Sequence, residues 1–280
     1  MRVIICIKQI PDPRNAVFDL QKGKITVINR IINPADVHAL EEGLRIKETH
    51  GAELIVLSLG PEECDAALTH ALTRGVDSAI RVWNDSVDPA DTWAISCLIH
   101  TIVKSIGFDL ILCGNASEDT SSEFVWAALS ELLNVPMVTR VVGLELSGKN
   151  DGIAHKKLEK GRRETYSFKL PAVIGVVEGI NHPRYSALFS RAYQEGIRKK
   201  IEVMDPGPPL PTAAPMVSLV RVTQPKPRTR TGKKLTGLSV AAMMRVLKGE
   251  TGGQKEIFSG PAAKGAEKIA VKLMEWIRQP

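Results

Sequence analysis

Apolar positions along the first half of the chain follow two alternating patterns. Short continuous apolar runs are typical of strands buried on both faces of a sheet, and they occur at residues 3–7, 54–60, 78–83 and 110–114. Between these runs, apolar residues recur every three to four positions, which predicts helices at about 33–46, 61–75, 88–105 and 121–133. Strands and helices in this order predict an α/β fold, with a mostly parallel sheet and helices on both of its faces.

The pattern changes after residue 141. Residues 144–156 read as an antiparallel hairpin that turns at 148–152. An alternating strand at 165–170 and a buried strand at 171–177 follow the hairpin. A short edge strand is expected earlier in the chain, at 24–27. A loop from residue 185 then passes into a basic helix that ends near Lys200.

A proline-rich stretch at 205–211 is typical of a linker. We therefore predict an α/β domain over residues 1–204 and a C-terminal arm over 205–280, which has too few strands to be an independent domain. The arm's expected elements are a strand and two helices, at 218–223, 239–248 and 262–277.

The basic residues of the chain are clustered in a few segments. The formal net charge is +6, and basic residues cluster at 156–163, 198–200 and 226–234. Aromatic residues do not alternate with these clusters, as stacking on bases would require, so binding to nucleic acid is disfavoured. A basic docking face or a surface for an anionic cofactor fits this pattern better.

The cysteines and the apolar runs indicate the compartment. The four cysteines are widely spaced and form no CxxC motif, which favours buried free thiols in a reducing compartment over disulfides or metal ligands. The chain opens directly into a short apolar strand, without a signal-peptide pattern. No apolar stretch approaches the roughly 20 residues of a membrane span. We expect a cytoplasmic protein, or one of an equivalent matrix compartment.

No catalytic constellation is visible. The sequence lacks a GxGxxG loop, a Walker loop and a GxSxG elbow, and its six histidines form no HxH or HxxxH pair. We therefore expect neither enzymatic activity nor a metal site from this chain alone.

Two segments are candidates for a nucleotide site, because parallel sheets bind ligands at the carboxyl ends of their strands. Residues 114–123 follow a buried strand and open a helix, and their hydroxyl and backbone N–H groups suit a phosphate. The alternative is an elaborate helix cap made by Asp119 or Ser121. Residues 33–36 form a polar helix start that could meet an adenine or ribose, or could be a plain cap by Asn33 with Asp36 in the first turn.

A third candidate is the loop over residues 181–188. It combines a proline, an arginine, a tyrosine and a leucine just beyond a buried strand. Loops of this kind on a rigid scaffold often carry recognition, although a well-packed connection is the alternative.

Together these segments resemble the β subunit of electron-transfer flavoproteins, over about residues 1–204 and more weakly in the arm. The similar blocks are KQIPD, NP followed by EEGLR, LGP, ALTRGVD and PAV followed by NHPRY, at residues 8–12, 33–45, 59–61, 71–77 and 171–185.

The resemblance implies an adenine-nucleotide α-hydrolase-like fold and an electron carrier rather than an enzyme. It implies an α-subunit partner, with FAD held at the shared interface. Donors would be acyl-CoA dehydrogenase-type flavoenzymes, as in fatty-acid oxidation, and the acceptor would be a membrane or iron–sulfur quinone reductase. The β subunit would bind AMP, or a second FAD if the protein were of the electron-bifurcating type.

The resemblance also implies site residues. The nucleotide site would comprise Cys6, Asn33, Pro34, Ala35, Asp36, Leu59, Gly114, Asn115, Ala116, Asp119, Thr120, Ser121, Ser122 and Val125. The partner-binding loop would comprise Asn181, Pro183, Arg184, Tyr185 and Leu188, with Leu188 as the apolar anchor for dehydrogenases.

The chain departs from the family pattern at four places. Thr120, Glu123 and Trp126 replace glycines, so we expect Glu123 to repel a phosphate and Trp126 to fill part of the pocket. Lys157–Leu158 replaces an arginine–acid pair that contacts the α subunit and its flavin. A scaffold with an empty pocket is therefore one alternative. An ATP-binding protein is another, although Lys8–Pro11 stands where an ATP pyrophosphatase would carry its SGGxDS loop.

Overall fold

The computed structural model describes residues 1–12, 14–19, 24–27, 29–83, 91–147, 150–185, 196–197 and 200–207, together with residues 266, 269, 270 and 274. The chain divides into two units, Met1–Gln224 and Pro225–Pro280. The four described positions of the second unit are helical and fall within the helix predicted over 262–277. The other elements predicted for the arm lie outside the described residues, so the predicted boundary at 204/205 stays a prediction.

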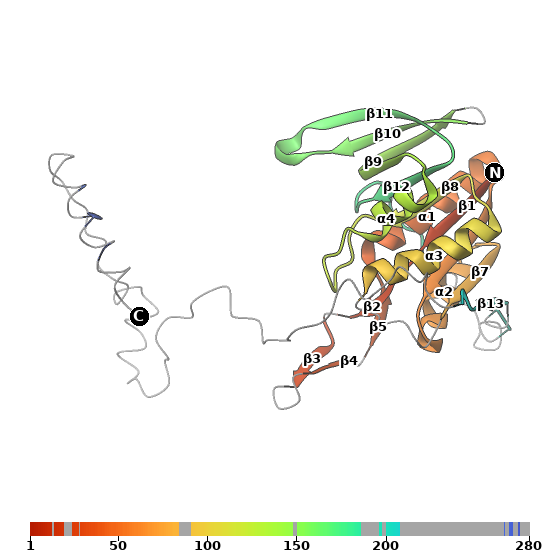
Figure 1. Ribbon diagram of the computed structural model, residues 1–280, viewed down its shortest axis with the longest axis horizontal. Coiled ribbons are helices and arrows are strands. Elements are labelled where there is room, and N and C mark those ends of the chain that lie inside the picture. Colours follow the sequence, from red (N-terminus) through yellow and green to blue (C-terminus); the bar gives the residue numbers. More distant parts are fainter. Residues whose placement is uncertain are drawn as a thin grey trace. The chain divides into compact units, whose positions relative to one another are not determined.

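One nine-stranded sheet organises the first unit, in the order β11-β10-β9-β12-β8-β1-β6-β7-β13 (Figure 1). The seven strands from β9 to β13 in this order run parallel to their neighbours, and β10 and β11 are antiparallel additions. Their bounds are β1 Arg2–Cys6, β6 Glu53–Leu59, β7 Ser78–Val82, β8 Leu110–Gly114, β9 Met137–Ser147, β10 Asp151–Lys157, β11 Arg163–Lys169, β12 Ala172–Val176 and β13 Ile201–Met204.

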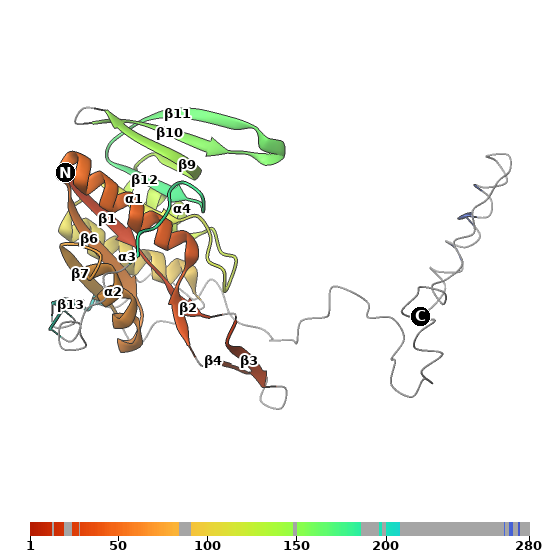
Figure 2. The same cartoon turned by 180° about the vertical axis from the view of Figure 1, so that it is seen from behind.

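Helices cover both faces of the sheet. Helices α1 (Pro34–His50) and α2 (Asp65–Leu72) pack on one face and are in front in Figure 2. Helices α3 (Thr92–Ile106) and α4 (Val125–Leu133) pack on the other. Neighbouring side chains of a central strand point to opposite faces of the sheet: Ile5 packs in the core with α1 and α2, and Ile4 packs in the core with α3 and α4. The predicted fold class is confirmed.

Smaller elements surround the sheet. Two ribbons pair β2 (Gln9–Pro11) with β5 (Arg30–Ile32) and β3 (Ala16–Asp19) with β4 (Lys24–Val27). The predicted strand at 24–27 is therefore real, but it pairs with β3 and not with the main sheet. Short 3₁₀ turns, η1 (Glu62–Cys64) and η2 (Glu159–Gly161), precede α2 and β11. No helix among the described residues is long and apolar enough to cross a membrane.

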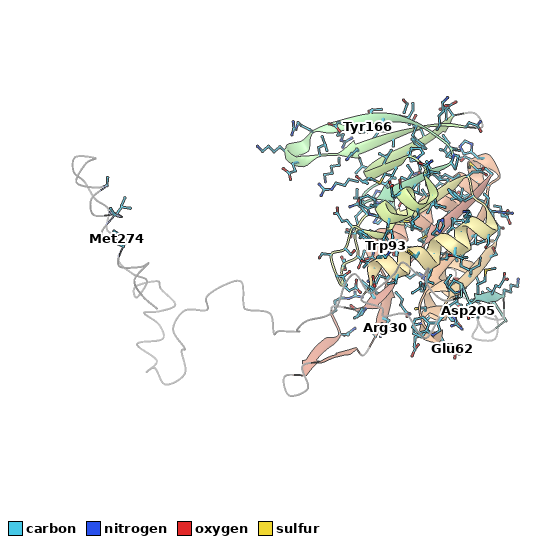
Figure 3. All side chains as sticks on the ribbon, viewed as in Figure 1. Arg30, Glu62, Trp93, Tyr166, Asp205 and Met274 are labelled. Atoms are coloured by element: carbon cyan, nitrogen blue, oxygen red, sulfur yellow. The ribbon has the colours of Figure 1, made fainter. Side chains whose placement is uncertain are left out.

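The antiparallel strands carry one of the basic clusters. Lys156 and Lys157 end β10, and Arg163 begins β11, so this cluster lies around the connection between the two strands. Tyr166, on the outermost strand, is exposed (Figure 3). The Lys156 ammonium lies 5.9 Å from the centre of its ring.

Two elements differ from the sequence prediction. Strand β13 was not predicted, because its four residues, Glu202 among them, form no continuous apolar run and only its pairing with β7 makes it a strand. Helix α4 begins at Val125 rather than near Ser121, because Ser121 adopts a left-handed conformation with φ of 52° that a helix does not permit.

Candidate functional site

A cavity of about 480 Å³ opens at the carboxyl ends of β1, β6 and β8, between those strands and helices α3 and α4. Most of the residues predicted for the nucleotide site line it. These are Cys6, Asn33, Asp36, Leu59, Gly114, Ala116, Thr120, Ser122 and Val125. Ile7, Lys8, Thr92, Ile95, Ile99, Cys113, Ser117 and Trp126 complete the lining.

The Asp36 carboxylate links the ends of two strands. One oxygen accepts the Lys8 backbone N–H at 2.7 Å, and the other accepts the Gly114 N–H at 2.9 Å. Burial raises the pKa of Asp36 to about 7, although the bonds from Lys8, Asn33 and Gly114 oppose the rise. Asp36 lies in the first turn of α1, as expected, and its carboxylate also fixes the edge of the sheet.

Close packing explains Gly114. A Cβ atom at this position would lie 2.9 Å from the Cβ atom of Ala35 and would also collide with the Asp36 carboxylate. The end of β8 therefore needs glycine so that the start of α1 can approach it.

Asn33 ties the loop after β8 to α1. Its amide nitrogen donates to the Ala116 carbonyl at 2.9 Å, and its amide oxygen accepts the Glu118 N–H at 3.1 Å. Asn33 is the residue before α1, but its side chain makes no capping bond to the helix. The expectation of a plain side-chain cap is wrong, because both polar atoms are used across the site.

Lys8 supplies a cation to the cavity. Its ammonium lies 2.7 Å from an Asp119 carboxylate oxygen and 3.2 Å from the Ser117 hydroxyl. Burial alone would raise the pKa of Asp119, but the bonds from Lys8 and Ser117 outweigh it and lower that pKa. Lys8 was missing from the predicted site residues. The available signal was a lysine placed directly beyond a buried strand.

The loop between β8 and α4 leaves the helix start uncapped. The Ser121 N–H donates to the Ser117 carbonyl at 2.7 Å, which turns the chain before the helix. Phe124 precedes α4 and, within the described part of the chain, no side chain caps the helix there. The prediction that Asp119 or Ser121 would be the cap is wrong. The first N–H groups of α4, at Val125 and Trp126, lie in residues that line the cavity.

The replacements of glycine have different consequences. Trp126 lines the cavity as expected, and its indole N–H donates to the Asn115 carbonyl at 2.7 Å. Glu123 does not line this cavity. Its carboxylate accepts a hydrogen bond from the Asn115 side-chain amide at 3.0 Å and lies 3.8 Å from the Arg140 guanidinium. The expectation that Glu123 faces and repels a phosphate in this cavity is therefore wrong.

Trp93, on α3 (Figure 3), contacts Phe124, the residue before α4. Their rings pack edge to face, with centres 6.4 Å apart. This contact holds the uncapped end of α4 against α3.

A second, more open cavity of about 590 Å³ lies on the other side of the same loop. The predicted residues Ala35, Asn115 and Ser121 line it, and Ala116 lines both cavities. Two predicted site residues, Pro34 and Asp119, are not among the described residues that line either cavity. Asp119 contacts the site through its ion pair with Lys8. Charged and apolar side chains complete the second cavity, including Glu123, Arg140, Lys157, Leu158 and Glu159.

The predicted recognition loop is anchored to α1. The buried Asn181 amide donates to the His38 carbonyl at 3.0 Å and to Glu42 at 2.9 Å. Arg184 binds Glu41 at 2.9 Å and also pairs with Glu48.

Beyond these anchors, the loop exposes a tyrosine. Tyr185 is 98% exposed, and Pro183 lies between the two anchors. Leu188 lies outside the described residues. Asn181 and Arg184 therefore act as anchors that hold the exposed tyrosine, and their predicted role in partner binding is not tested by this geometry.

All four cysteines are free; Cys64, Cys97 and Cys113 are buried, and Cys6 is half-buried. In the described ranges no three metal-ligating side chains come together.

These features define an α/β protein with a cavity at the carboxyl edge of a parallel sheet, where a cation and a helix start meet an apolar wall. The chain matches the family model of the electron transfer flavoprotein domain over residues 25–209. It therefore belongs to the electron transfer flavoprotein family, as a β-type, electron-carrying subunit.

Curated relatives agree. The chain is 34% identical over 191 residues to an electron transfer flavoprotein subunit beta of Bacillus subtilis, covering 67% of this chain and 73% of the relative. It is 32% identical over 190 residues to the subunit beta of Clostridium acetobutylicum, with the same coverage of 67% and 73%. It is also 32% identical over 203 residues to the caffeyl-CoA reductase–Etf complex subunit CarD of Acetobacterium woodii, covering 70% and 77%.

Proposed function

We propose that this chain pairs with an α subunit to form a heterodimeric electron-transfer flavoprotein, and that it binds AMP in the cavity at the ends of β1, β6 and β8. The observation that carries the proposal is the Lys8 ammonium facing that cavity together with the uncapped start of α4. A cation and free N–H groups at a helix start are what a phosphate requires.

The remaining walls suit a purine. Leu59, Ile95, Ile99 and Val125 give the cavity an apolar side on which an adenine could lie, and Asn33 and Ser122 add polar atoms at its edge. A volume of about 480 Å³ fits a mononucleotide. FAD has more than twice as many atoms as AMP and would have to extend out of the cavity.

FAD belongs to the proposal as the group shared with the α subunit, and it supplies the electron-transfer chemistry when bound. We place it against the second cavity, where Arg140 and Lys157 give this chain two cations for an anionic cofactor. The replacement of the family's acid by Leu158 leaves this contact to the two cations. Co-expression with an α subunit tests the pairing: the expected product is a one-to-one complex with one FAD, and a β chain that purifies alone without flavin would contradict it.

The second candidate is a bifurcating subunit with FAD in place of AMP. Similarity to the caffeyl-CoA reductase–Etf subunit supports it, but the cavity volume does not. An ATP-binding protein and an empty scaffold are the further alternatives, and the nucleotide recovered from the protein separates all four.

The electron donors would be acyl-CoA dehydrogenase-type flavoenzymes, and the acceptor a membrane or iron–sulfur quinone reductase, in the cytoplasm. Leu188→Ala should slow reduction by the donor while leaving flavin content unchanged, and a normal rate would remove the anchor role from Leu188. The arm at 205–280 should contact the α subunit, so that its deletion causes the heterodimer to dissociate. A heterodimer that survives the deletion would show that the arm is not needed.

A further inference from the structure

Two cysteine side chains lie side by side on the floor of the nucleotide cavity. Cys6 ends β1 and Cys113 is the penultimate residue of β8, and the two are direct partners in the parallel pairing of these strands. Both side chains point to the same face of the sheet, because Ile4 and Ile111, two residues earlier, both lie in the core with α3 and α4. Both cysteines line the cavity.

The two thiols differ in access. Cys6 is half-buried, whereas Cys113 is 5% exposed. A hydrogen bond with the Cys6 thiol, followed by burial, raises the pKa of Cys113 well above its usual range. Cys6 is therefore the thiol that a reagent in the cavity meets first, and Cys113 is the neighbour that can respond.

The other two cysteines are buried like Cys113 but lie away from the cavity. Cys64 and Cys97 are 7% and 2% exposed, and neither is among the described residues that line the cavity. The chain therefore contains its own internal controls for thiol chemistry.

We propose that Cys6 and Cys113 form a reversible disulfide when no nucleotide covers them, and that a bound nucleotide protects them. Neighbouring strands are about 4.8 Å apart, which lies within the Cα separation that disulfides span. The protection rests on the proposed function, because it assumes that the nucleotide occupies this cavity. The formation of the disulfide does not depend on that assumption.

The oxidant is a small-molecule disulfide. The Cys6 thiolate attacks one of its sulfur atoms, breaks the sulfur–sulfur bond and releases one small thiol. Cys113, on losing its proton to solvent, then attacks the Cys6 sulfur and displaces the second small thiol. The two protein thiols lose two electrons in total, and the small disulfide gains them. An excess of small thiol reverses both steps.

Mass spectrometry of the full chain tests the proposal. The protein is incubated with oxidised glutathione, its remaining thiols are alkylated, and its peptides are analysed. The expected result is a linked Cys6–Cys113 peptide with Cys64 and Cys97 fully alkylated. Cys113→Ser should instead accumulate glutathione on Cys6, and Cys6→Ser should abolish the link and leave Cys113 largely unmodified. Absence of the linked peptide, or links that involve Cys64 or Cys97, would overturn the proposal.

A second arm adds AMP, after calorimetry has verified that it binds. Saturating AMP should slow formation of the linked peptide at least severalfold, and an unchanged rate with AMP bound would overturn the protection. If calorimetry detects no AMP binding, the proposed nucleotide is wrong, and the arm without AMP still decides whether the thiol pair forms.

Discussion

The ammonium of Lys8, just beyond β1, lies 2.7 Å from the carboxylate of Asp119 in the loop before α4. This pair places a positive and a negative charge at the same edge of the cavity. The cation attracts a phosphate, and the carboxylate both positions the cation and opposes the phosphate.

Lys8→Met should weaken AMP binding. A hydrogen bond to a charged group contributes about 1.5–3 kcal/mol, and because Lys8 is partly exposed we expect the lower end, or about a tenfold rise in Kd. Isothermal calorimetry on the full chain measures it. Asp119→Asn is the matched control, since it removes the negative charge and leaves Lys8 free; its Kd should stay the same or fall. Equal losses in both variants would mean that the pair is structural.

Gly114→Ala should destabilise the fold. The added methyl would meet Ala35 and the Asp36 carboxylate, and such overpacking costs about 1–3 kcal/mol. Urea denaturation gives the change in the free energy of unfolding. Gly196→Ala is the control, because this helical glycine has open space around it and alanine there should be neutral or stabilising. A Gly114→Ala protein as stable as the control would contradict the close approach of α1 to β8.

Asp36 should make stability depend on pH. Its pKa is about 7 in the folded protein and near 3.8 when unfolded, so the folded state binds more protons between these values. Stability from this group is therefore present at pH 4 and is lost as pH rises to 7, at up to about 1.4 kcal/mol per pH unit. From pH 4 to pH 7 the free energy of unfolding of the wild type should therefore fall relative to that of Asp36→Asn. A constant difference between the two proteins would show that Asp36 does not titrate in this window.

Arg184→Met should release the recognition loop from α1. Arg184 binds two carboxylates, one of them the buried Glu41, so its loss leaves a buried charge without its partner. We expect faster proteolysis next to Tyr185 and slower reduction by the dehydrogenase donor, with unchanged flavin content. Arg14→Met is the control, because Arg14 also pairs with a buried carboxylate, that of Asp12, which belongs neither to α1 nor to the recognition loop. Similar proteolysis of both variants would argue against an anchor.

The fold followed from the sequence because buried parallel strands and amphipathic helices leave clear apolar patterns. Strand β13 left none, since two of its four residues are well exposed and its pairing with β7 is set by tertiary structure. The loop at 115–124 was located correctly, but its conformation was not, because the left-handed Ser121 is not encoded by any residue preference.

Side-chain directions were the least predictable part of the site. Asn33 and Asp36 looked like ordinary residues of a helix start, yet both form hydrogen bonds to the segment at 114–116, about 80 residues away in sequence. Asp36 also accepts a hydrogen bond from Lys8, just beyond the end of β1. Glu123 looked as if it faced the phosphate, yet it pairs with Asn115 and Arg140 in the other cavity. These choices depend on contacts between segments that the sequence does not show to be neighbours.

The nucleotide recovered from the purified heterodimer tests the central claim most directly. Acid extraction followed by chromatography should yield AMP and FAD in equal amounts, one of each per heterodimer. Two FAD and no AMP, ATP in place of AMP, or FAD without any adenine mononucleotide would each contradict the assignment of the cavity to AMP.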